Sequence, residues 1–115
     1  MATLPIDDDH APLYTVGQVA AMLDLRQAFL RRLDEYQVVR PRRTEGGQRR
    51  YSRVEITRVQ YVVELVQEGL TLPAIRRILE LESRVRDLER RHEEDQRRIR
   101  DLEARLRAHG ISPRS

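Results

Sequence analysis

Residues 15–51, TVGQVAAMLDLRQAFLRRLDEYQVVRPRRTEGGQRRY, are the stretch that decides the fold. Thr15 and Gln18 form a capping box, the pairing of a side chain with a backbone amide that opens many helices. Apolar residues then recur at helical spacing over 16–23 and again over about 27–36. Two short helices separated by a two- or three-residue interruption predict a helix-turn-helix unit.

A β-hairpin is expected directly after the second helix. Two short extended arms flank Glu45-Gly46-Gly47, and paired glycines favour a tight turn. The arms carry four arginines: Arg42, Arg43, Arg49 and Arg50. This hairpin, expected within residues 38–51, is called the wing.

Two further helices follow the wing. Ser52 and Glu55 form a second capping box, and Gly69 is expected to end the helix that they open. Thr71 is expected to cap the next helix, with Pro73 tolerated in its first turn. The predicted core residues are Phe29, Leu30, Leu33, Val59, Val62 and Val63.

From Ile75 onward the apolar residues recur by alternating steps of three and four, which is the heptad pattern of a coiled coil. Acidic residues and arginines four positions apart support a long helix that ends near Gly110. One apolar stripe on a lone helix needs a partner, so a homodimer is expected. The predicted dimer interface consists of Leu81, Val85, Leu88, His92, Asp95, Ile99, Leu102 and Leu106.

Two orientations of the paired helices are open. An antiparallel register in which partner numbers sum to 187 sets His92 against Asp95 and Leu88 against Ile99. A parallel pairing sets Asp95 against Asp95, which is unfavourable in an apolar interface. The flanking charges match better in the parallel arrangement, but exposed ion pairs contribute only about 0–1 kcal/mol each. The antiparallel orientation is therefore favoured.

Composition excludes several classes of protein. The chain has 115 residues, of which 36% are charged, and it has no cysteine, so no disulfide, thiolate metal site or thiol switch is expected. The three histidines are too scattered for a metal site. We find no catalytic constellation and expect neither an enzyme nor a cofactor. The N-terminal residues lack the features of a signal peptide and no apolar stretch could span a membrane, which favours a cytoplasmic protein.

Positive charge is concentrated in one part of the chain. Residues 26–58 contain ten arginines and four acidic residues, a local charge of +6, whereas the whole chain carries +3. Such an excess on a helix-turn-helix with a basic hairpin is typical of binding to double-stranded DNA. A solvated arginine-rich surface is the alternative interpretation.

Several residues are candidate DNA contacts. Arg31 is expected to grip a base edge or a phosphate from the second helix, unless it pairs with Asp34 or Glu35. Arg32 and Gln27 are further candidates on the same helix. The other candidates are expected to contact phosphates: Thr15, Gln18, Arg43, Arg49, Arg50 and Tyr51. For Tyr51, packing in the core is the alternative.

The order of these elements resembles the MerR family of bacterial transcription regulators. The similarity covers about residues 14–81 and includes Tyr14-Thr-Val-Gly-Gln-Val-Ala20, Arg43-Thr-Glu-Gly-Gly47 and Arg49-Arg50-Tyr51-Ser52. Within the family, residues 68–82 look most like the HspR heat-shock repressors. Two departures stand out. Tyr36-Gln37 occupies the place of a usual Leu-Gly pair, and Arg26 replaces a common Ser cap, so Asp24 is expected to cap the second helix instead.

The resemblance implies a homodimer, held by antiparallel coils, that binds palindromic operators with its second helix in the major groove. HspR-like members repress chaperone operons with a DnaK-type chaperone as co-repressor. The expected organisation is mostly α: a mobile acidic tail (1–13), a winged helix-turn-helix DNA-binding domain (14–80), a long C-terminal coiled-coil dimerisation helix (81–109) and a short tail (110–115).

The function predicted from the sequence is therefore a dimeric repressor of a stress or chaperone operon. Two alternatives remain, namely a coiled-coil adaptor whose basic end binds an acidic protein and an architectural protein that binds DNA without sequence preference.

Overall fold

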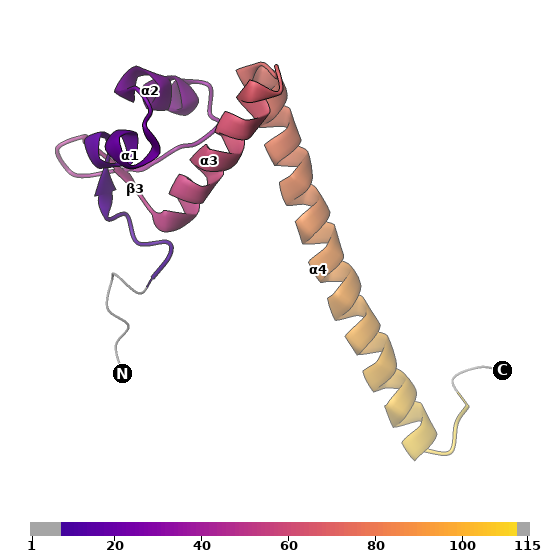
Figure 1. The fold of residues 1–115 in the computed structure, drawn as a ribbon. Coiled ribbons are helices and arrows are strands. Elements are labelled where there is room, and N and C mark those ends of the chain that lie inside the picture. The colour runs from indigo at the N-terminus through magenta and orange to yellow at the C-terminus, as the bar shows by residue number, and fades with distance from the viewer. Residues whose placement is uncertain (1–7, 113–115) are drawn as a thin grey trace. The chain divides into compact units, whose positions relative to one another are not determined.

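The computed structural model describes residues 8–112 (Figure 1). Its contacts divide the chain into two compact units, one up to Leu79 and one from Glu80. The described part of the first unit, residues 8–79, is called the head. The mostly helical class expected from the sequence is confirmed, with these elements in chain order: β1 (Tyr14–Thr15), α1 (Val16–Leu23), α2 (Gln27–Glu35), β2 (Arg42–Arg43), β3 (Arg49–Tyr51), α3 (Arg53–Gln67) and α4 (Leu72–Ala108).

Both capping boxes form as predicted. The Thr15 hydroxyl accepts a hydrogen bond from the Gln18 backbone at 3.1 Å, and the Gln18 side chain accepts one from the Thr15 backbone at 2.8 Å. Ser52 and Glu55 repeat this reciprocal pair at the start of α3, also at 3.1 and 2.8 Å. Two of the free amide groups at each helix end are thereby satisfied, which fixes where α1 and α3 begin.

The start of α2 differs from the prediction. Its N-cap residue is Arg26, which makes no side-chain capping bond. Asp24 instead ends α1 in a left-handed conformation, with φ 54°, and its backbone N–H donates to the Ala20 carbonyl. The expectation that Asp24 caps α2 is therefore wrong, because this residue terminates the preceding helix.

A three-stranded antiparallel sheet has the order β1-β3-β2. The wing consists of β2 and β3, in which Arg42 faces Arg50 and Arg43 faces Arg49. Strand β1, which the sequence did not reveal, pairs Thr15 with Arg50 on the other side of β3. This pairing connects β3, the central strand of the sheet, to Thr15, the residue that caps α1.

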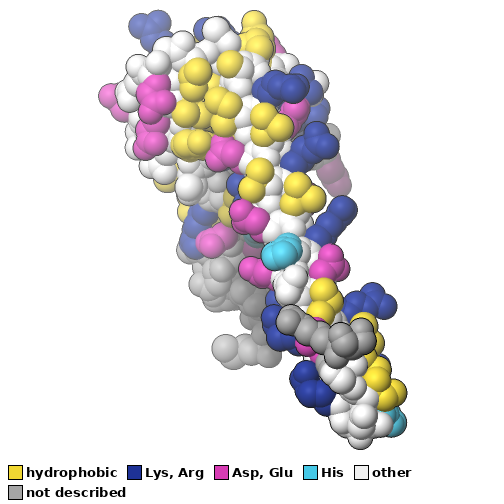
Figure 2. Space-filling model, turned by 90° about the vertical axis from the view of Figure 1, so that its right-hand side faces the viewer, with side chains coloured by type: hydrophobic (Ala, Val, Ile, Leu, Met, Phe, Trp, Pro, Cys, Tyr) yellow, Lys and Arg dark blue, Asp and Glu magenta, His cyan; other side chains and the backbone are white. Residues whose placement is uncertain are grey.

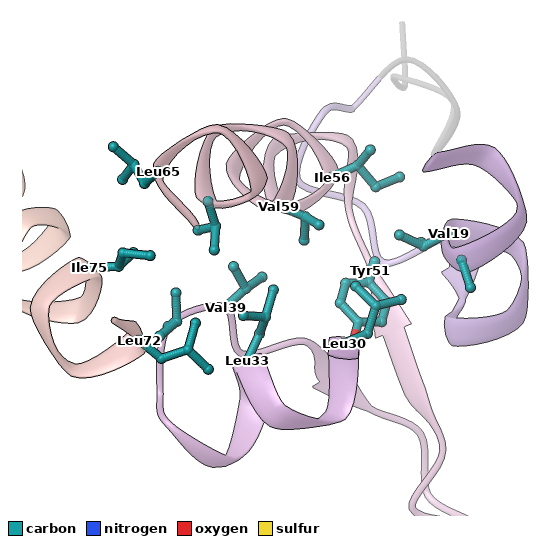
Figure 3. Packing of buried hydrophobic residues seen from close by; sticks show 13 residues of the cluster. Val19, Leu30, Leu33, Val39, Tyr51, Ile56, Val59, Leu65, Leu72 and Ile75 are labelled. Atoms are coloured by element: carbon teal, nitrogen blue, oxygen red, sulfur yellow. The ribbon is translucent and has the colours of Figure 1, made fainter. Parts of the chain in front are cut away.

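The core of the head lies between α2 and α3 and is closed by α1, β3 and the first turns of α4 (Figure 3). Four of the six predicted core residues are buried: Leu30, Leu33, Val59 and Val62. The other two, Phe29 and Val63, pack against the core while partly exposed. The start of α4 also belongs to the head, because Leu72 and Ile75 are buried in the same cluster.

The described part of the N-terminal segment is attached to the head. The Val54 amide donates to the Asp9 carbonyl at 3.1 Å, and the Arg53 guanidinium lies 3.5 Å from the Asp9 carboxylate. The Tyr14 hydroxyl and Asp9 raise the pKa of Arg53. Of the tail that was expected to be mobile, Asp9 thus contacts the start of α3, while residues 1–7 lie outside the described residues.

Helix α4 runs unbroken for 37 residues. It ends as predicted before Gly110, which adopts φ 73°. Arg97, Arg105 and Arg107 pair with acidic residues four positions earlier. Asp87, in contrast, pairs with Arg90 rather than with Arg91. Residues 113–115 of the expected C-terminal tail lie outside the described residues.

The predicted heptad positions form an exposed stripe on one face of α4 (Figure 2). Val85 is 51% exposed and Leu88 is 61% exposed, although apolar side chains of this size are normally buried. None of the helices in residues 8–112 is long and apolar enough to cross a membrane. The stripe, called the seam below, comprises Leu81, Val85, Leu88, His92, Asp95, Ile99, Leu102 and Leu106.

Candidate nucleic-acid interface

The arginines of residues 26–58 lie at the surface of the head. Seven of the ten are exposed and three are half-buried. Most of this positive charge therefore faces solvent, as a surface that binds a polyanion requires.

Helices α1 and α2 and the wing together border one hollow of about 370 Å³. Arg31 reaches this hollow from α2, Arg49 and Arg50 reach it from β3, and Thr15 lies at the start of α1. The structure thus brings four of the nine predicted DNA contacts together from three separate elements. Guanidinium groups beside a helix N-terminus provide donors that match phosphate oxygens and base acceptors.

Arg31 is available for an external contact. The sequence left open whether it pairs with Asp34 or Glu35, but it forms no ion pair within residues 8–112 and is exposed. Gln27, the first residue of α2, is also exposed, and its side-chain amide lies beside Gly17 of α1. Gln18 is exposed too, but its side chain is already bonded to the Thr15 backbone.

Asp34 holds two of the wing arginines. Its Oδ2 atom accepts a hydrogen bond from Arg49 Nε at 2.8 Å and another from Arg43 Nη2 at 3.0 Å. Arg43 also donates through Nη1 to the Gly47 carbonyl at 3.0 Å, which links the carboxylate to the turn of the wing. This arrangement, the Asp34 clamp, connects α2 with both strands of the wing.

The clamp occupies two of the four wing arginines. The sequence assigned Arg43, Arg49 and Arg50 to phosphate, yet the first two face a carboxylate of their own chain. Arg42, which the sequence analysis did not select, is exposed and has no carboxylate partner in the described part of the chain. Only the three-dimensional position of Asp34 distinguishes these arginines, because all four have similar neighbours in the sequence.

Tyr51 lies in the core, so its side chain is not available for the phosphate contact that the sequence suggested. Its side chain is fully buried, and its hydroxyl has no hydrogen-bond partner among residues 8–112. Burial raises the pKa of Tyr51 to about 12, with smaller effects from Arg49, Asp34, Glu55 and Arg43. The alternative interpretation in the sequence analysis, a residue that packs the wing against the core, describes this position.

Arg32 faces a different part of the head from Arg31. It borders a depression of about 310 Å³ between α2 and the connection from α3 to α4, together with Phe29, Tyr36 and Val66. Successive residues on a helix point about 100° apart, which explains why neighbouring arginines serve different surfaces. Arg32 does not belong to the group around the hollow.

No group of three or more metal-ligating side chains occurs within residues 8–112. The polar side chains that border the hollow are guanidinium, amide and hydroxyl donors, from Arg31, Arg49, Arg50, Gln48 and Thr15.

A family model described as "MerR HTH family regulatory protein" matches residues 14–82, from β1 into α4. The chain belongs to the MerR family. The resemblance inferred from the sequence is confirmed, and this chain is a DNA-binding transcriptional regulator of the MerR family.

Named relatives are similar over the same region. A putative heat shock protein HspR of Streptomyces coelicolor is 38% identical over 84 residues, which is 72% of this MerR chain and 56% of that relative. The regulator GlnR of Bacillus cereus is 29% identical over 64% of this chain and 57% of its own. MlrA of Escherichia coli is 29% identical over 62% of this chain and 30% of its own. The match therefore spans about half or less of each relative.

Solved structures share the fold of this MerR protein. HiNmlR, a MerR family regulator that lacks the sensor domain and was crystallised with promoter DNA, aligns with a TM-score of 0.56 at 22% identity over 84% of each chain. MtaN, the N-terminal part of a Bacillus subtilis multidrug transporter activator, aligns with a TM-score of 0.54 at 23% identity over 81% of this chain and 97% of its own.

Proposed function

We propose that this MerR protein is a homodimeric repressor that recognises a palindromic operator of a stress or chaperone operon. The observation that carries the proposal is the hollow where Arg31 of α2 meets Arg49 and Arg50 of the wing. It unites Arg31, a side chain able to read base edges, with Arg50, a side chain able to hold the backbone. The 38% identity with HspR supports the stress-related role.

In the proposed complex, α2 enters the major groove and Arg31 grips a base edge through its two parallel donors. Arg42 and Arg50 hold the phosphates that flank the groove, since neither has a carboxylate partner in the described chain. Thr15 and the first amides of α1 approach a neighbouring phosphate. The exposed Gln27 of α2 and Gln18 of α1 are proposed as further contacts.

The second head is supplied by a second copy of the chain through the seam. Side chains such as Leu88, 61% exposed in the single chain, become buried when two α4 helices pair. The proposed orientation is antiparallel, with His92 facing Asp95 of the other copy at the centre. A palindrome then presents one half-site to each head, because both have two-fold symmetry. A DnaK-type chaperone is the proposed co-repressor, on the similarity to HspR alone.

The test is a binding titration with two duplexes at about 50 and 200 mM salt. One duplex is a palindrome that the protein itself selects from a random pool, and the other is a scrambled version of it. We expect the palindrome to bind at least about 1,000-fold more tightly at the higher salt. An adaptor would bind neither duplex, and an architectural protein would bind both equally, so either result contradicts the proposal.

Leu88→Glu tests the assembly. It places a charge in the seam, so we expect monomers by sedimentation velocity and loss of operator binding at the same concentration. Ser83→Glu is the matched control, because it adds the same side chain to an exposed position outside the seam. A Leu88→Glu protein that remains dimeric would show that the seam is not the interface.

A further inference from the structure

The structure assigns Asp34 a role beyond local packing: we infer that it is a positioning residue for DNA specificity, which withholds two wing arginines from phosphate and fixes the wing against α2. This inference rests on the proposed function, since it concerns how the same surface discriminates between duplexes. It starts from the geometry of the Asp34 clamp.

The clamp reduces the repulsion between two arginines within the wing. Arg43 and Arg49 are directly opposite each other on neighbouring strands, and like charges in such cross-strand pairs repel. Asp34 Oδ2 lies within 3.0 Å of both guanidinium groups and so neutralises part of this repulsion. The Asp34 side chain is 14% exposed and that of Arg49 is 20% exposed, so solvent screens this interaction only in part.

The same contacts divide the wing arginines into two pairs. Side chains alternate along a strand, so Arg42 and Arg50 lie on the face opposite to Arg43 and Arg49. The clamp binds Arg43 and Arg49, whereas Arg42 and Arg50 have no carboxylate partner in residues 8–112. The wing therefore offers phosphate two arginines rather than four.

This restraint favours specific over non-specific binding. Every additional arginine that binds phosphate strengthens binding to all sequences alike, because phosphate contacts carry no base information. A carboxylate that holds two arginines lowers this general attraction. It also fixes the distance between the wing and Arg31 of α2, so that phosphate contact and base contact occur in one register.

Asp34→Asn tests the inference, because the amide keeps the shape but loses the charge that holds both guanidiniums. We measure binding to the self-selected palindrome and to its scrambled version across a salt series. For the scrambled duplex, the slope of log affinity against log salt is expected to steepen by about 1–2, at about 0.9 for each further phosphate that the released arginines bind. The preference for the palindrome is expected to fall about tenfold. Greater non-specific binding by a variant with an unchanged circular dichroism spectrum cannot come from a loss of structure.

Glu35→Gln is the matched control. It removes the same charge from the next residue of α2, where the carboxylate makes no ion pair within residues 8–112 and is exposed. Its salt slope is expected to remain that of the wild type. Equal slopes for Asp34→Asn and Glu35→Gln would overturn the inference.

A second pair of variants tests the clamp without touching Asp34. Arg42→Gln removes a proposed phosphate contact and should lower the slope by about 0.9, whereas Arg43→Gln should leave it unchanged. Equal decreases for both variants would overturn the inference. A wild-type protein that binds neither duplex would instead contradict the proposed function, so the two failures can be distinguished.

Discussion

At position 51 the chain buries a phenol whose oxygen has no partner in the described structure. A buried hydroxyl without a hydrogen bond loses its interactions with water and gains none in return. The ring belongs to the same buried cluster as Leu30, Val19 and Ile56 in the core of the head (Figure 3). The aromatic carbons of Tyr51 therefore stabilise the fold, while the oxygen opposes it.

Tyr51→Phe is expected to leave stability at pH 7 unchanged or to raise it by up to about 1 kcal/mol. The wild type has an additional pH dependence. The pKa is about 10 in the unfolded chain and about 12 in the folded one, so stability is complete below pH 10 and falls as the pH rises toward 12. At pH 11 this amounts to about 1 kcal/mol, which the variant should not lose.

Urea unfolding at pH 7 and pH 11, followed by circular dichroism, measures both effects. Tyr36→Phe removes the same oxygen from a ring that is 44% exposed and serves as the control. A loss of more than about 1 kcal/mol at pH 7 in Tyr51→Phe would mean that the hydroxyl has a hydrogen-bond partner after all.

Residue identity alone predicted the location of the basic surface but not the function of each arginine. Arg43 and Arg49 lie nine and fifteen positions from Asp34, and nothing in that spacing indicates that one carboxylate oxygen accepts from both. The burial of Tyr51 was equally inaccessible, because a tyrosine at the end of a basic strand suits a phosphate contact and a core position alike.

At the scale of the elements, the helix ends marked by a capping box or a glycine were the most predictable features. A capping box or a glycine acts through neighbours within four residues, so its effect can be derived from the local sequence. Strand β1 was not predictable, because two residues cannot show the alternation that marks a strand. It exists because β3 offers it a partner, which is a tertiary effect.

Gln37 explains one departure from the family pattern. It follows α2 with φ 60°, in the left-handed region where a glycine meets no steric penalty. The resemblance described in the sequence analysis implies a glycine at this point, whereas this chain has a side chain that strains the turn. The strain is located in the connection between α2 and the wing.

Gln37→Gly is expected to stabilise the head by about 1 kcal/mol, because it removes the steric cost of the left-handed conformation. Gln60→Gly is the matched control. This exposed residue lies inside α3, where the same substitution should cost about 1 kcal/mol. Opposite shifts in the midpoint of thermal unfolding are the expected result. Destabilisation by both variants would show that the Gln37 side chain makes a contribution that outweighs the strain.

At the scale of the whole molecule, the sequence predicted a seam but could not determine the orientation of its partner. Heptad positions follow from periodicity within one chain, whereas orientation depends on contacts between two chains. The central His92 and Asp95 favour the antiparallel choice, and the flanking charges favour the parallel one. Both residues are exposed in the single chain, so the contacts of the seam with a second copy remain a prediction.

Cysteine pairing distinguishes the two orientations, because the natural chain contains no thiol. In the antiparallel register, position 88 lies opposite position 99. Mixed Leu88→Cys and Ile99→Cys proteins are therefore expected to form a disulfide between the two variants, and neither variant should cross-link alone. Efficient homodimer cross-links from Leu88→Cys by itself, read on a non-reducing gel, would establish the parallel arrangement.

The short edge strands of the sheet limit how the protein can associate. Strands β1 and β2, which flank β3 in the described sheet, are two residues long, and β2 consists of arginines. Edges this short, one of them made of arginines, give a neighbouring molecule little backbone to add to. When the mass of the protein in solution changes with concentration, that change should therefore measure the affinity of one α4 seam for another, free of any contribution from strand addition.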